Sequence, residues 1–147
     1  MAERTQSTLV NIPFVYSAIF LFFEPFAAFF GSILLHMSPS IFLNSMSPTS
    51  KYAPDNQIIY DQLAATYTLF AFNECILLRI TNDLRVWKGV LFGILVCDAL
   101  HLYGSWAALG GQVFWDPRVW RVEDWINLGT LWGQAAVRVA FLAGVGL

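Results

Sequence analysis

Four ionisable side chains in this sequence lie inside stretches that are otherwise apolar. They are Glu24, Glu74, Asp98 and Arg138. Three of them carry carboxyl groups, which can exchange protons, and the fourth is a permanent cation. A carboxylic acid beside a carboxylate can give a proton to one atom of a substrate and take one from another. These residue types therefore indicate acid–base chemistry in an apolar environment.

Glu24 is the most informative of the four. It lies in the apolar run from Ile12 to Leu35, which as a helix would be about 36 Å long, against a hydrocarbon core of about 30 Å. Glu24 is therefore predicted near the midplane of a bilayer, where an ionisable group costs about 2.5–3.5 kcal/mol by insertion scales. Because such groups normally face a polar partner or a wet cavity, we interpret Glu24 as part of a functional site.

Asp98 and His101 are three residues apart, so they share one face of a helix. His101 could orient Asp98 or relay protons to it, although a lone intramembrane histidine is more often a packing hydrogen-bonder. Glu24 and Asp98 are predicted at similar depth on parallel helices, which suits them to act as an acid and a base. The expected catalytic residues are therefore Glu24, Asp98 and His101.

Glu74 and Arg138 are expected to form a buried ion pair, because both lie about 5 Å to the same side of the midplane on parallel helices. Asn73 and Gln134 are placed to complete its hydrogen bonds. A purely structural role for the pair is an equally good interpretation, because intramembrane charges often pair for stability alone. One arginine is not expected to neutralise three carboxylates, so at least one carboxyl should carry a proton near neutral pH.

Aromatic side chains could shape an apolar substrate pocket beside these groups. The first hydrophobic segment is rich in phenylalanine, and most of those rings are expected to face lipid or to pack. Tyr67, Trp106 and Trp132 are expected to line the pocket, where their π faces could stabilise a developing cation.

The composition indicates a membrane protein. Hydrophobic residues make up 57% of the 147 residues, charged residues only 12%, and the mean hydropathy is +0.58, whereas soluble domains carry about 25% charge. The net charge of −2 gives no electrostatic basis for binding nucleic acid. Cys75 and Cys97 lie in apolar segments and are interpreted as small hydrophobic residues, so no metal site is expected.

Four hydrophobic segments must position the polar residues. The sequence predicts an all-α fold, a bundle of four transmembrane helices with a polar cavity at mid-membrane depth, as one integral membrane domain over residues 1–147. The first segment is too long for a signal peptide, so we expect it to be retained. The helices are predicted at about residues 12–37, 60–80, 87–109 and 125–146.

The connections differ in character. Residues 38–59 are rich in proline and serine and predict a turn-rich loop that acts as a lid or an interfacial segment. Residues 110–121 mix tryptophan with arginine, as interfacial segments do. Arg4, Arg79, Arg85 and Lys88 form a small positive bias on one side, which predicts both termini in the cytoplasm. The endoplasmic reticulum is the expected membrane.

Several short strings resemble those of known proteins. Four helices with acidic residues at mid-depth are loosely similar to the emopamil-binding-protein superfamily of sterol isomerases and sigma-2-type receptors. The chain carries the strings Phe22-Phe23-Glu24-Pro25-Phe26, Asn73-Glu74-Cys75, Cys97-Asp98-Ala99-Leu100-His101-Leu102-Tyr103 and Trp115-Asp116-Pro117. In these strings it more closely resembles small integral-membrane proteins encoded in fungal polyketide and meroterpenoid clusters, some of which are assigned as epoxide hydrolases or cyclases.

Three functions stay open from the sequence. The first is a cofactor-independent enzyme of secondary metabolism that opens an epoxide in a lipophilic polyketide or terpenoid, by hydrolysis or cyclisation. The second is a double-bond isomerase of the sterol type, which would use the same acid and a base. The third is a non-catalytic lipid-binding or scaffold protein. The expected partners are a lipophilic small molecule and membrane lipid, and assembly into a homo-oligomer stays open.

Overall fold

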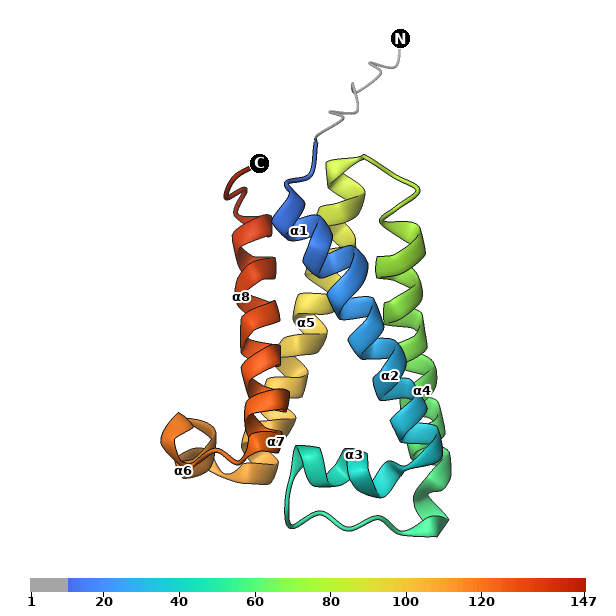
Figure 1. The fold of residues 1–147 in the computed structure, drawn as a ribbon, viewed down its shortest axis with the longest axis vertical. Coiled ribbons are helices and arrows are strands. Elements are labelled where there is room, and N and C mark those ends of the chain that lie inside the picture. The colour runs from blue at the N-terminus through green and yellow to red at the C-terminus, as the bar shows by residue number, and fades with distance from the viewer. Residues whose placement is uncertain (1–10) are drawn as a thin grey trace.

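The computed structural model describes residues 11–147, and this part of the chain is helical and contains no β-strand (Figure 1). Four long helices make up most of it. The first long helix joins α1 (Phe14–Ala18), a π-helical segment (Ile19–Phe23) and α2 (Glu24–Met37). The second joins α4 (Gln57–Phe72) and a π-helical segment (Asn73–Leu77), and the third is α5 (Leu84–Leu109). The fourth joins α7 (Val122–Asp124), a π-helical segment (Trp125–Gly129) and α8 (Thr130–Leu142).

Short helices lie in two connections for which none was predicted. They are α3 (Pro39–Met46) and α6 (Gly111–Phe114), with 3₁₀ turns at Pro54–Asn56 and Pro117–Val119. The prediction of a turn-rich loop over 38–59 was therefore wrong for residues 39–46. Pro39 occupies the first turn of α3, where a missing N–H costs nothing, and Phe42 is buried beside Leu35 and Ala64. Tertiary burial thus stabilises a helix in a segment whose local composition favours turns.

The long helices pack in two pairs, α2 along α4 and α5 along α8. In Figure 1 these pairs come together at the end that holds α1 and the chain's C-terminus, and they diverge toward α3. The Tyr16 hydroxyl donates a 2.7 Å hydrogen bond to the Val145 carbonyl, which ties the beginning of the first helix to the end of the last. Arg4, on which part of the predicted orientation rests, lies outside the described residues.

A compact aromatic core fills the end where the helices converge. Tyr16 and Phe20 each contact Phe141, with ring centroids 5.0 and 5.8 Å apart, and Trp87 lies 5.9 Å from the same ring. Leu78, from the end of the second helix, is fully buried in this cluster. The core therefore joins all four long helices at one level of the bundle.

At the opposite end, α3 lies across the bundle rather than along it (Figure 1). It packs on α2 and α4 through Phe42, Leu35 and Ala64. The Arg121 guanidinium donates to the Asn44 carbonyl at 3.1 Å and so also fastens α3 to the start of the fourth helix. This short helix consequently bridges the two diverging helix pairs.

Two helices, Phe14–Met37 and Leu84–Leu109, are long and apolar enough to cross a membrane. Many of their large apolar side chains point outward: Phe22, Phe23, Phe26 and Phe30 are each at least half exposed. Exposed apolar surface on this scale is typical of a protein that contacts lipid or a partner.

The Arg138 cluster as a candidate functional site

Arg138 on α8 lies in contact with three carboxyl groups, one from each of the other long helices. Its guanidinium donates hydrogen bonds to Glu24 and to Asp98, and a longer one of 3.4 Å to Glu74. Glu24, Glu74 and Arg138 are each 2–3% exposed and Asp98 is 7% exposed. The structure thus brings together the four charged side chains of apolar segments that the sequence singles out.

The order of contacts within this Arg138 cluster differs from the predicted one. The sequence pairs Arg138 with Glu74, whereas in the structure Glu74 is its most distant carboxyl partner and Asp98 and Glu24 lie closer. The prediction rests on counting residues from the middle of each helix. Counting fixes depth but not which helices are neighbours, and α8 packs against α5, which carries Asp98.

Two of the three acids lie at irregularities of the helix. Glu24 comes directly after the π-helical segment Ile19–Phe23, and Glu74 lies inside the segment Asn73–Leu77. These two π-helical segments contact each other. A π-helical turn inserts one extra residue and re-aims the side chains around it, and such turns are frequent at functional sites.

Proline explains part of the irregularity beside Glu24. Pro25 has no N–H, so the carbonyl of Leu21, four residues earlier, lacks its usual helical donor. Arg79, at the end of the second helix, supplies the missing donor with a 2.7 Å hydrogen bond to that carbonyl. Its guanidinium also lies 4.4 Å from the centre of the Phe22 ring.

The cluster is not fully satisfied by its own hydrogen bonds. Within the described residues, the Glu24 Oε1 and Arg138 Nε atoms are buried without a hydrogen-bond partner. If all four groups were ionised, three negative charges would face one positive charge in an apolar interior. Because an uncompensated buried charge is strongly unfavourable, charge balance favours a proton on the surplus acids.

The supporting residues named from the sequence lie near the cluster without joining its hydrogen bonds. Asn73, Gln134 and His101 are half-buried. In the part of the chain that the structure describes, the hydrogen bonds of Arg138 go to the three carboxyls and not to Asn73 or Gln134. His101 lies one helical turn after Asp98 on α5, and its role as an orienting group stays a prediction.

The predicted aromatic pocket residues are not gathered in one place. Tyr67 packs against Phe42, with ring centroids 5.9 Å apart, and a Cβ at Gly31 would come within 2.9 Å of its ring. Trp106 and Trp132 are 43% and 40% exposed. Spacing along the sequence cannot show that Tyr67 fills a close contact between α2 and α4 while the tryptophans lie on the outside.

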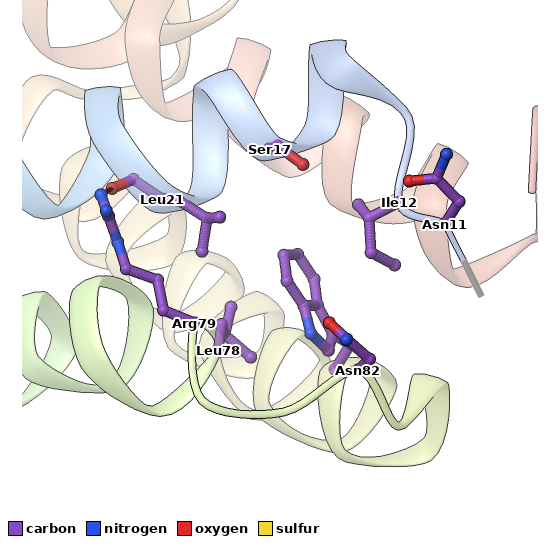
Figure 2. A pocket seen from close by; sticks show the side chains of 8 residues that line it. Asn11, Ile12, Ser17, Leu21, Leu78, Arg79 and Asn82 are labelled. Atoms are coloured by element: carbon purple, nitrogen blue, oxygen red, sulfur yellow. Dashed lines mark hydrogen bonds between the residues drawn. The ribbon is translucent and has the colours of Figure 1, made fainter. Parts of the chain in front are cut away.

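Two pockets lie at opposite ends of the bundle, and neither is lined by a residue of the Arg138 cluster. A pocket of about 490 Å³ opens between the first helix and the α4–α5 connection, and is lined by Asn11, Ile12, Ser17, Leu21, Leu78, Arg79, Asn82 and Trp87 (Figure 2). The other, of about 460 Å³, lies near α6 and is lined by Phe114, Trp115, Pro117, Trp120, Trp125, Gly129 and Trp132. The predicted cavity at mid-depth is matched by neither pocket.

Sequence reasoning missed two polar features. Arg79 was treated only as part of the orientation bias, although Pro25 signals a free carbonyl that needs a donor. Arg121 and Asp124, three apart, form an ion pair of 2.8 Å at the start of the fourth helix, where acidic residues in the first turn are a helix-start signal. Among residues 11–147, no group of histidine, cysteine and acidic side chains has the arrangement of a metal site.

A single protein family covers nearly all of the chain. The model of the family described as "Domain of unknown function (DUF7704)" matches residues 9–147. The chain belongs to this family. No curated protein and no solved structure is significantly similar to it. The match includes all four members of the Arg138 cluster.

Proposed function

We propose that the protein is an integral membrane enzyme that performs acid–base chemistry on a lipophilic substrate at the Arg138 cluster. The observation that carries this proposal is the convergence of Glu24, Glu74 and Asp98 on one buried arginine. The four groups come from four different long helices, which are proposed to span the membrane together. The exposed apolar side chains of the first and third of these helices support that arrangement.

The surplus of carboxyl groups favours catalysis over simple stabilisation. One carboxylate is enough to neutralise Arg138, and two further acids add desolvation cost without adding a counter-charge. Acids held in this way retain a proton that they can donate, and the carboxylate nearest the arginine can accept one. Arrangements of several titratable groups that shift each other's protonation are typical of active sites.

The opening of an epoxide needs one acid and one base, so it fits this pair of roles. The resemblance to fungal cluster proteins supports the same reaction class. One of Glu24 and Asp98, as the acid, gives its proton to the epoxide oxygen while the C–O bond breaks. Water, or a hydroxyl of the substrate, forms the new C–O bond and passes its proton to the other carboxylate. A proton then moves between the two carboxyls through the cluster, and the site returns to its starting state.

Isosteric amides test the proposal. Glu24→Gln and Asp98→Asn keep the side-chain shape and remove proton exchange, so each is expected to lower the rate per folded molecule by about 10²-fold or more. The measurement uses purified protein in detergent, a lipophilic epoxide and water labelled with heavy oxygen. Label in the product reports hydrolysis, and a ring closed without label reports cyclisation.

The matched control is Asp55→Asn, because Asp55 is an exposed carboxyl outside the cluster. This variant should turn over at the wild-type rate. Wild-type turnover in both Glu24→Gln and Asp98→Asn would end the catalytic proposal. A product that has gained no oxygen and opened no ring would replace epoxide opening with double-bond isomerisation.

A further inference from the structure

The pocket at the converging end of the bundle combines a charged group with apolar walls. Its lining divides evenly between polar side chains (Asn11, Ser17, Arg79, Asn82) and apolar ones (Ile12, Leu21, Leu78, Trp87). Figure 2 shows the Arg79 side chain extending from the second helix to Leu21 on the first, where it donates to the Leu21 carbonyl. A volume of about 490 Å³ is in the range of small-molecule sites.

Arg79 differs from the other arginines of residues 11–147. Arg85, Arg118, Arg121 and Arg138 each form a salt bridge with at least one carboxylate. Arg79 forms none within these residues, and its contacts are the Leu21 carbonyl and the Phe22 ring. A neutral carbonyl and a ring hold the guanidinium in place without cancelling its charge, and a guanidinium has five N–H donors, of which this hydrogen bond uses one.

We propose that this pocket binds the anionic group of an amphiphilic molecule, with Arg79 as the anchor. The fixed, uncompensated guanidinium suits a carboxylate or a phosphate, which it can bind through two parallel hydrogen bonds. The apolar part of the ligand lies against Ile12 and Leu21, which are partly buried and pack on the core that contains Leu78 and Trp87. Ser17 and Asn82 add polar groups elsewhere on the pocket wall. The inference does not depend on the proposed catalytic role of the Arg138 cluster.

The walls of the pocket also continue into the cluster. Leu21 lies three residues before Glu24 on the first helix, and Leu78 lies four residues after Glu74 on the second. Each separation is about one helical turn, or roughly 5 Å along the axis. A ligand held at Arg79 is therefore held close to two of the three buried acids.

Fluorescence quenching can test the site, because Trp87 is the one tryptophan that lines it. The probe is a fatty acid brominated on its chain, added to the full-length protein in uncharged detergent at a pH where the acid is ionised. The same quenching is measured with the methyl ester of this fatty acid and with a brominated phosphatidic acid. Inorganic phosphate is added as a competitor. We expect quenching by the fatty acid or the phosphatidic acid, at least about tenfold weaker apparent binding of the ester, and no competition by inorganic phosphate alone.

Variants separate binding at the pocket from general contact with detergent-dissolved lipid. Trp87→Phe should remove the saturable part of the quenching. Arg79→Gln should weaken binding by about tenfold or more, Arg79→Lys by less because it keeps the charge, and Ser17→Leu should weaken it by filling the pocket while leaving Arg79 in place. Arg85→Gln is the matched control, since Arg85 pairs with Asp83 outside the pocket.

The source of the anion is identified by which arm binds. Saturable binding of phosphatidic acid alone identifies a phospholipid site, and binding of the fatty acid alone identifies a carboxylate site. Equal binding of acid and methyl ester, or wild-type binding in both folded Arg79→Gln and Ser17→Leu, would overturn the proposal. If inorganic phosphate alone displaced the bound fatty acid, the amphiphile proposal would be overturned and the pocket would be a simple anion site.

Discussion

Two arginine–carboxylate sites in this chain are built in opposite ways. Arg121 binds one carboxylate three residues away: its Nε and Nη2 atoms lie 3.1 and 2.8 Å from the two oxygens of Asp124. Arg138 meets Asp98, Glu74 and Glu24, which are 40, 64 and 114 residues away. The first site is local and balanced in charge, whereas the second is long-range and carries two surplus acids.

On the proposed function, this difference separates a stabilising contact from a reactive one. Asp124 also accepts a 2.9 Å hydrogen bond from the Arg121 backbone N–H, so its carboxylate satisfies a free backbone donor at the start of α7. The hydrogen bond from the Arg121 guanidinium holds the pKa of Asp124 below its usual value. In the Arg138 cluster two buried polar atoms stay without partners. A site built only for stability would resemble Arg121 and Asp124.

The largest expected effect is the loss of Arg138. Arg138→Met leaves three carboxyls buried without a cation and should lower the free energy of unfolding by about 3–5 kcal/mol. Arg121→Met leaves one carboxylate near the end of the bundle, with a backbone donor still present, and should cost about 1.5–3 kcal/mol. Thermal and denaturant unfolding of both purified variants in detergent measure the two losses. Equal losses in the free energy of unfolding would mean that Arg138 stabilises the protein no more than an arginine paired with one carboxylate does.

Removing one acid should reverse the ranking of the two sites. Glu74→Gln replaces the most distant of the three acids, which charge balance favours in its protonated form, with an amide of the same shape. It should change the free energy of unfolding by less than about 1 kcal/mol. Asp124→Asn removes the carboxylate that pairs with Arg121 and should cost about 1.5 kcal/mol. Unfolding at neutral pH checks both. A larger loss for Glu74→Gln would show that Arg138 needs all three carboxylates ionised.

The smallest expected effect is the pH dependence of the local pair. Because the pKa of Asp124 is lowered in the folded state, its stabilisation is present above the unfolded value, about 3.9, and is lost as the pH falls through the folded value. Wild type should therefore exceed Asp124→Asn in stability at pH 7, and the gap should close below about pH 4. Unfolding curves of both proteins from pH 7 to pH 3 measure it. A gap that widens on acidification would contradict the pairing.

The sequence was sufficient to predict the long helices and the convergence of four charges, because the cost of burying charge in an apolar segment forces polar side chains onto one face. It predicted helix ends less closely: the fourth helix, predicted over 125–146, runs from Val122 to Leu142. The Asp124 carboxylate, which accepts from the Arg121 backbone N–H, stabilises an earlier start for that helix, and the helix ends before Gly144, which has a φ of 82°.

The π-helical segments have no clear signal in a single sequence. Seven-residue spacing places Tyr67 and Glu74 on one stripe of an ideal α-helix, but an extra residue in a turn at Asn73–Leu77 rotates the side chains beyond that turn. Together with the packing of α8 on α5, this is why residue counting could not predict the order in which the three acids contact Arg138. The burial of Phe42, which stabilises α3, likewise depends on contacts with α2 and α4 that local composition does not contain.

The position of Arg138 in the fourth helix has a consequence for how the protein is made. During synthesis all three acids leave the ribosome before their arginine does, Glu24 earliest, by 114 residues. On the proposed membrane topology, the first three helices reach the bilayer with carboxyls that have no cation to meet. They must enter protonated or wait beside the insertion machinery, so a chain truncated after α5 is expected to be recognised as incomplete and degraded. On this topology, the carboxyls of the cluster meet their cation only when the fourth helix arrives.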